Sequence, residues 1–247
     1  MSIGRSPSRG LRVGGAPARL APHPTTSAGP RSLPRISRGP AVVTSTVLIV
    51  GVLAHEVEGM LRSGQGPRLP AEAVCPACGG ALGSWGQRGY RRYVRAEGVT
   101  HTIWIARAVC QACGVTHALS PSFLLARRRD MVATIGRALI AAARGQGQLQ
   151  IAERLVRAPA TVRGWLRRLR AVAGERAGVL WVLAARLGIQ APRPPPHPPA
   201  PLGALVDALA AAHRGARALL GPEGLPDVWG FLSAATGGRL LANTSRP

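Results

Sequence analysis

Two matching pairs hold all four cysteines of the chain, Cys75-Pro-Ala-Cys78 and Cys110-Gln-Ala-Cys113, and a glycine follows each pair. A two-residue gap lets one tight turn aim two thiolates at one ion, and Zn²⁺ prefers four ligands at tetrahedral angles. The 31 residues between the pairs exceed the usual ribbon spacing and leave room for a hairpin that brings the pairs together. We predict a zinc ribbon in which these four cysteines bind one structural Zn²⁺ ion.

Three other kinds of cysteine chemistry fit this pattern less well. Two disulfides need an oxidising compartment, and nothing in the sequence supports export. A thioredoxin-like redox site does not need a second, matching pair. An iron–sulfur cluster uses the same ligands but usually at other spacings. Because four thiolates fill the tetrahedron, the zinc should be structural rather than catalytic, and the nearby His117 should be a surface or packing residue.

The residues between the two pairs favour β-strands. Residues 89–95 and 100–109 are rich in Tyr, Val, Ile, Thr and Trp, and Glu97-Gly98 lies where a turn would join them. Before the cysteines, residues 46–51 have the composition of a short buried strand, and residues 54–63 have the apolar spacing of a short helix.

Apolar residues at helical spacing dominate the rest of the chain. Residues 130–144 are the clearest case, because Ile135 and Leu139 belong to one apolar stripe and Gly145 follows as a stop signal. Further helices are expected at residues 149–156, 159–172, 176–187, 202–220 and 228–236.

We therefore expect an α+β fold, in which a small zinc-ribbon β domain is followed by a mainly helical helix-turn-helix bundle. Residues 1–42 are rich in Arg and Pro and lack acidic residues, so they should remain a disordered tail. A Pro-rich stretch at residues 191–201 should form an extended linker. The expected parts are the tail at 1–42, the zinc ribbon at 43–125, the bundle at 126–190, the linker at 191–201 and a small helical C-terminal segment at 202–247.

Residues 151–169 have the layout of a helix-turn-helix motif. A first short helix would bury Ile151 and Ala152, and Pro159 stands where the second helix would begin. Four apolar residues then recur at i, i+3, i+4 and i+7, which indicates one buried stripe: Val162, Trp165, Leu166 and Leu169. Trp165 should therefore belong to the core rather than stack on bases.

The opposite face of the second helix carries the candidate DNA-binding residues, Thr161, Arg163, Gly164, Arg167, Arg168 and Arg170. The first half of such a helix enters the major groove. Thr161 and Arg163 are best placed for base edges, because Arg can bond guanine O6 and N7 together, whereas the later arginines should meet phosphates. An ordinary solvated Arg face is the alternative, but no acidic residue between Pro159 and Arg170 would support it through ion pairs.

Two residues depart from the usual motif. Glycine is common at the turn, but this chain has the β-branched Val156, which resists a positive φ. The usual Ser or Thr cap is replaced by Ala158, which should cost about 1 kcal/mol of capping and one phosphate contact.

The charge of the chain favours a polyanionic partner. The net charge is +22, and all 32 basic residues are Arg, which suits nucleic acid first and an anionic membrane surface second. The longest apolar run, residues 41–54, falls short of the ~20 residues that cross a bilayer. We expect a cytoplasmic protein that is nucleoid-associated when bound to double-stranded DNA, with no membrane partner.

Six segments carry a resemblance to a known family: CPACGGALGSWG, RAVCQACGVTHALSPSFLLARRRD, IGRAL, IAERL, TVRGWLRRLR and TGGRLLA. Together they resemble an uncharacterised family of high-GC bacterial proteins, catalogued as a domain of unknown function, that combines an N-terminal zinc ribbon with a transposase-like helix-turn-helix. The resemblance covers about residues 46–242. It implies mobile-element ancestry and DNA binding, supplies no known activity, and places the family's metal cysteines on the four cysteines of this chain.

The leading hypothesis for function is a DNA-binding regulator or an accessory factor of a mobile element, without enzymatic activity or a small-molecule substrate. A catalytic transposase or recombinase is the runner-up. Two-metal cleavage needs converging carboxylates, but the chain has only ten acidic residues, and its two tyrosines lie inside the predicted ribbon. An RNA-binding zinc-ribbon protein and a pure protein-interaction module are further alternatives.

Overall fold

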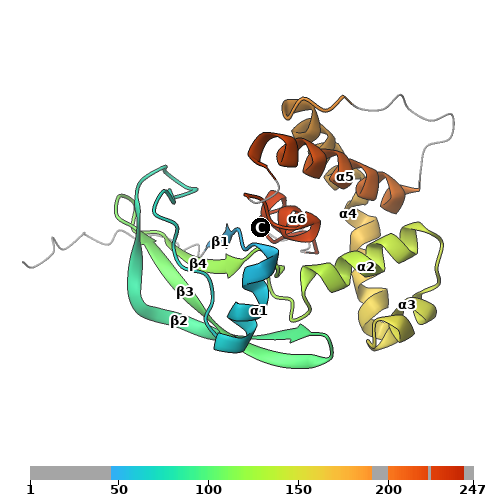
Figure 1. Ribbon diagram of the computed structural model, residues 1–247, viewed down its shortest axis with the longest axis horizontal. Coiled ribbons are helices and arrows are strands. Elements are labelled where there is room, and N and C mark those ends of the chain that lie inside the picture. Colours follow the sequence, from blue (N-terminus) through green and yellow to red (C-terminus); the bar gives the residue numbers. More distant parts are fainter. Residues whose placement is uncertain (1–45, 191–199, 222–223, 242–247) are drawn as a thin grey trace, which may run out of the picture. The chain divides into compact units, whose positions relative to one another are not determined.

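The computed structural model describes residues 46–190, 200–221 and 224–241. The predicted tail at 1–42 and most of the predicted linker at 191–201 lie outside these ranges. The described residues belong to one compact unit of mixed α+β fold (Figure 1).

A four-stranded sheet holds the first half of the described chain. Its strands are β1 (Thr46–Val50), β2 (Leu82–Ala96), β3 (Val99–Cys110) and β4 (Thr116–Pro121). Their order across the sheet is β1-β4-β3-β2. β1 and β4 run parallel, whereas the other neighbouring strands are antiparallel.

Six helices complete the described residues. They are α1 (Ala54–Ser63), α2 (Val132–Ala143), α3 (Gln148–Arg154), α4 (Pro159–Arg186), α5 (Pro201–Leu220) and α6 (Val228–Ala235). None of them is long and apolar enough to cross a membrane.

The β2–β3 hairpin confirms the two strands predicted between the cysteine pairs. Its two-residue turn consists of Glu97 and Gly98, whose φ angles are 47° and 85°. Two positive φ angles define the turn type whose twist matches that of paired strands. Val94 of β2 and Ile103 of β3 are fully buried, and they belong to one cluster, against which the apolar side chains of α1 pack.

Strand β4 was absent from the sequence-based prediction. All six of its residues are buried, so the alternation of apolar and polar residues that marks a half-exposed strand is missing. Its partner β1 pairs with it in parallel, with Thr46 opposite His117 and Val50 opposite Pro121. The long separation between these segments hides the pairing from local sequence patterns.

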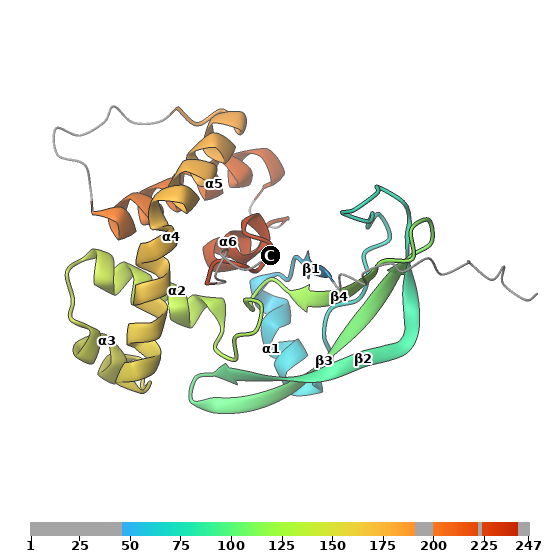
Figure 2. The same ribbon diagram turned by 180° about the vertical axis from the view of Figure 1, so that it is seen from behind.

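Helix α4 corrects the expectation of two separate helices at 159–172 and 176–187. It runs without interruption through Gly174 and Gly178. Neither glycine is needed for close packing, because a Cβ added at either position would meet nothing within 4 Å. Its buried stripe continues past these glycines through Ala173, Ala177, Leu180 and Ala184. α5 packs along this part (Figure 2), so tertiary packing outweighs the helix-weakening effect of glycine.

Helix α6 links the sheet segment to the helices. The Ser233 hydroxyl donates a buried hydrogen bond of 2.8 Å to the carbonyl of Leu124. On another side, α6 brings Trp229 against Gly136 of α2, where an added Cβ would lie 2.3 Å from the indole ring. The absence of a side chain at Gly136 therefore lets α2 and α6 approach closely.

Candidate metal centre and nucleic-acid interface

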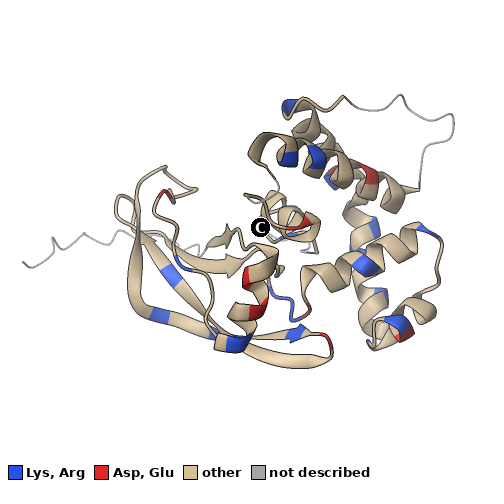
Figure 3. Cartoon of the chain, viewed as in Figure 1, with Lys and Arg blue, Asp and Glu red and all other residues tan. Residues whose placement is uncertain are grey.

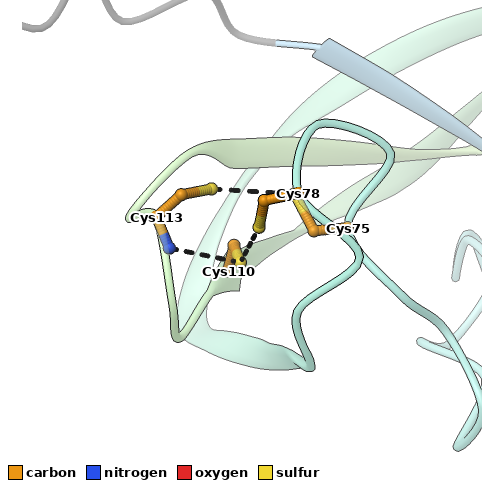
Figure 4. A group of neighbouring side chains, drawn as sticks. All are labelled: Cys75, Cys78, Cys110 and Cys113. Carbon is orange, nitrogen blue, oxygen red and sulfur yellow. Dashed lines mark hydrogen bonds between the residues drawn. The ribbon is translucent and has the colours of Figure 1, made fainter.

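The four cysteines meet at one end of the sheet (Figure 4). Cys75 and Cys78 occupy the turn before β2, Cys110 ends β3, and Cys113 lies in the turn before β4. All four sulfur atoms lie within 4.8 Å of one another, and none is in a disulfide. Sγ–Sγ distances are 3.8 Å between Cys75 and Cys113 and 3.5 Å between Cys78 and Cys110. This group could hold a metal ion.

The two cysteine turns have the same backbone geometry. The amide of Gly79 donates to the carbonyl of Cys75 at 2.8 Å, and the amide of Gly114 donates to the carbonyl of Cys110 at 3.0 Å. Both glycines have a φ of 72°, in the left-handed region that glycine adopts most readily. The glycine that follows each pair is therefore required by the turn that points the two thiols in one direction.

A backbone amide also points at the sulfur of Cys110. The N–H of Cys113 donates to this atom at 3.5 Å. This hydrogen bond, with smaller contributions from the amide of Ala112 and the neighbouring thiols, outweighs the effect of burial and lowers the pKa of Cys110 to about 6. At Cys78 the amide of Gly80 acts in the same direction, but the thiols of Cys113 and Cys110 and burial outweigh it and raise the pKa to about 12.

His117 lies beside the cluster inside β4. It is fully buried, and its Nε2 is 3.4 Å from the sulfur of Cys75. Burial lowers the pKa of this imidazole. Of the two roles predicted for His117, the structure shows packing and excludes exposure at the surface.

Helices α3 and α4 are joined by a tight turn at residues 155–158. Val156 in this turn has a φ of 50° and is 80% exposed. The residue expected to resist a positive φ therefore adopts one. As predicted, Pro159 begins α4, and Ala158 precedes it without a side-chain cap.

The predicted buried stripe of α4 is confirmed, since Val162, Trp165, Leu166 and Leu169 are at most 3% exposed. The six candidate DNA-binding residues divide into two groups. Those on one flank are exposed, namely Arg163, Arg167 and Arg170. Those on the other flank are half-buried, namely Thr161, Gly164 and Arg168. Because each residue turns the helix by about 100°, the two groups fall on different sides of α4. Figure 3 shows basic residues along this helix.

A buried ion pair that the sequence patterns did not predict lies next to this turn. Arg157 Nε lies 2.6 Å from Asp130 Oδ1, and Arg95 of β2 lies 4.0 Å from the same oxygen. The guanidinium of Arg157 also donates to the carbonyls of Leu155 and Val156. One carboxylate therefore ties the α3–α4 turn to the start of α2. Asp130 is the one acidic residue between Glu97 and Glu153, and this isolation among arginines was the sequence feature that could have indicated an ion pair.

The stretch from Cys75 to Trp165 thus contains the cysteine cluster, the strands β2 to β4 and the turn before α4. Residues 75–165 match a family model described as "Domain of unknown function (DUF6431)". The DUF6431 match crosses residue 125, the expected boundary between the ribbon and the bundle, and it ends within the buried stripe of α4. No curated protein and no solved structure matches the chain.

Proposed function

We propose that this chain is a DNA-binding protein whose sheet is stabilised by one structural Zn²⁺ ion, and that it acts as a regulator or an accessory factor of mobile-element ancestry. It would work in the cytoplasm, associated with the nucleoid when bound to double-stranded DNA.

The donor set of the cysteine cluster supports zinc. Zn–S bonds of about 2.3 Å at tetrahedral angles place the sulfurs about 3.8 Å apart, and the two pairs across the cluster are 3.8 Å and 3.5 Å apart. Cys75, Cys78, Cys110 and Cys113 would supply four thiolates and leave no position for water or substrate. The ion would supply positive charge that allows all four thiols to ionise together.

One observation carries the DNA-binding proposal. On α4, Arg163, Arg167 and Arg170 are exposed on the side away from the buried Trp165 stripe, and a tight turn joins this helix to α3. This arrangement supports the proposal of a helix-turn-helix motif, whose second helix enters the major groove. Exposed arginines suit both guanine edges and phosphates.

The chain should bind DNA without cutting it. Cleavage by two metal ions needs several carboxylates at one site, and only ten acidic residues occur in the sequence. Incubation of supercoiled DNA with the full-length protein and Mg²⁺ or Mn²⁺ should leave the DNA intact. Metal-dependent cleavage that persists through stringent purification would contradict this part of the proposal.

The test of binding uses full-length, zinc-loaded protein and selection of duplexes from a random pool. We expect one enriched sequence, bound more tightly than random duplex, with competition by unlabelled duplex DNA but little by structured RNA. Stronger competition by RNA would favour the alternative of an RNA-binding protein. No binding to either nucleic acid would refute the proposal.

A further inference from the structure

Three consecutive arginines connect the sheet to α2. Arg127, Arg128 and Arg129 form a loop, the arginine loop, which is followed by Asp130. Arg127 has a φ of 58°, a conformation that is uncommon for residues other than Gly, Asn and Asp. Such strain persists only where the surrounding structure fixes the backbone.

Several hydrogen bonds fix the arginine loop. The guanidinium of Arg92, on β2, donates to the carbonyl of Arg128 at 2.8 Å and also to the carbonyl of Leu125. The amide of Arg95 donates to the carbonyl of Arg129 at 2.7 Å. The chain leaves the loop at Asp130, which Arg157 holds from the α3–α4 turn. Both ends of the loop are therefore anchored, one to the sheet and one to the turn before α4.

The anchored loop presents positive charge at the surface. Arg127 and Arg129 are exposed, and the Arg129 guanidinium lies 5.7 Å from the centre of the Tyr93 ring. The next residue, Asp130, is buried and forms an ion pair with Arg157, so its carboxylate does not neutralise the positive charge of Arg127 and Arg129. A rigid surface with two arginines that form no ion pair among the described residues has the chemistry of a polyanion-binding site.

Arg128 is the middle residue of the arginine loop. It is half-buried, one of its NH groups donates to the carbonyl of Leu241, and its buried Nε has no hydrogen-bond partner among the described residues. Burial and then the positive charge of Arg168 lower the pKa of Arg128. The Asp130–Arg157 pair, at the turn before α4, places the loop beside the start of this helix.

We propose that the arginine loop is a second phosphate-binding element, which contacts the DNA backbone on one side of α4 through Arg127 and Arg129. A helix in the major groove lies between two phosphate backbones. The flank of Arg163 and Arg167 would face one of them. The other flank offers only half-buried side chains of α4, and the arginine loop at the start of the helix would supply exposed charge toward the second backbone. The inference rests on the proposed function.

The test measures the salt dependence of binding with the full-length, zinc-loaded chain and a random-sequence duplex. Arg127→Gln and Arg129→Gln each remove one exposed charge from the loop. Arg214→Gln removes the same charge from an exposed position on α5 and serves as the matched control. Thermal unfolding of each variant shows whether the fold is retained.

We expect each loop variant to reduce the slope of log K against log salt by about 0.9, the contribution of one phosphate contact, while Arg214→Gln leaves the slope unchanged. Equal slopes for the loop variants and the control would overturn the inference. If Arg167→Ala alters the slope and the loop variants do not, the loop proposal fails and DNA binding by α4 stands. Absence of duplex binding by the wild-type chain would refute both.

Discussion

Arg157 Nε lies 2.6 Å from Asp130 Oδ1, and only 5% and 10% of the two side chains are exposed to solvent. Asp130 stands just before α2, and Arg157 stands just before α4. The pair therefore sets the position at which α4 begins relative to α2. Since removal of one partner leaves the other charge buried, the contact is sensitive to single substitutions.

Replacing Asp130 with Asn should lower the free energy of unfolding by about 3 kcal/mol, because Arg157 would keep a buried charge without a counterion. Denaturant-induced unfolding measures this loss. The control is Glu58→Gln, which removes the exposed ion pair between Glu58 and Arg62 and should change the free energy by less than about 1 kcal/mol. Equal losses of unfolding free energy in the two variants would show that the buried ion pair stabilises the fold no more than the exposed one.

Replacing Val156 with Gly should stabilise the protein by about 1 kcal/mol. The valine is exposed and has a φ of 50°, so the substitution relieves backbone strain and removes no packing. Val179→Gly is the matched control, because Val179 is also exposed but lies inside α4, where glycine should destabilise by about 1 kcal/mol. A loss of stability in both variants would show that the turn is not strained.

Replacing Gly136 with Ala should destabilise the protein by about 1–3 kcal/mol, because the new Cβ would lie 2.3 Å from the Trp229 ring. Gly174→Ala makes the same change within α4 at a position with nothing within 4 Å and should stabilise by up to about 1 kcal/mol. Thermal unfolding of both variants gives the two signs. If Gly136→Ala stabilised the protein, the packing of α2 against α6 would differ from that described.

Metal analysis should find one zinc ion per folded chain. Cys110→Ser, or a strong chelator, should unfold the sheet around β2 and β3, because the binding energy of such a site is folding energy. Acid should release the ion, since protons compete with the metal for the four thiolates. Circular dichroism follows the unfolding, and added Zn²⁺ should restore the wild-type chain but not the variant. Iron in the purified protein, or an intact sheet without metal, would contradict the assignment.

Two arginines on the exposed flank of α4 should respond differently to replacement by Ala. Arg163→Ala should lose about 1–3 kcal/mol on the selected site and little on random duplex, because a bidentate base contact carries discrimination. Arg167→Ala should weaken both duplexes about equally and lower the salt slope by about 0.9. Equal weakening by Arg163→Ala on both duplexes would identify this helix as a basic face without sequence recognition.

Local sequence patterns predicted most of the fold. The spacing of apolar residues gave the exact bounds of α1 and the buried stripe of α4, because one buried face repeats at the helical period. The two CxxC turns likewise indicated that four thiols would meet, since the turn geometry depends on the glycine that follows each pair.

Other features depend on partners far away in the sequence. Strand β4 is buried on both faces and pairs with β1, about 70 residues earlier. The continuity of α4 through Gly174 depends on α5, although glycine alone favours a break. The Asp130–Arg157 pair joins residues 27 positions apart, and no spacing rule predicts which arginine among 32 a carboxylate will meet.

The unbroken course of α4 has a mechanical consequence. Its 28 residues form a rod about 42 Å long. At its first turns this rod carries the exposed arginines, and at its far end Leu187 packs against Gly215 of α5. A glycine-bearing hinge between two short helices would absorb a displacement, whereas a continuous rod transmits it. A displacement of α5 would therefore strain the Asp130–Arg157 pair, which holds the arginine-bearing end of α4.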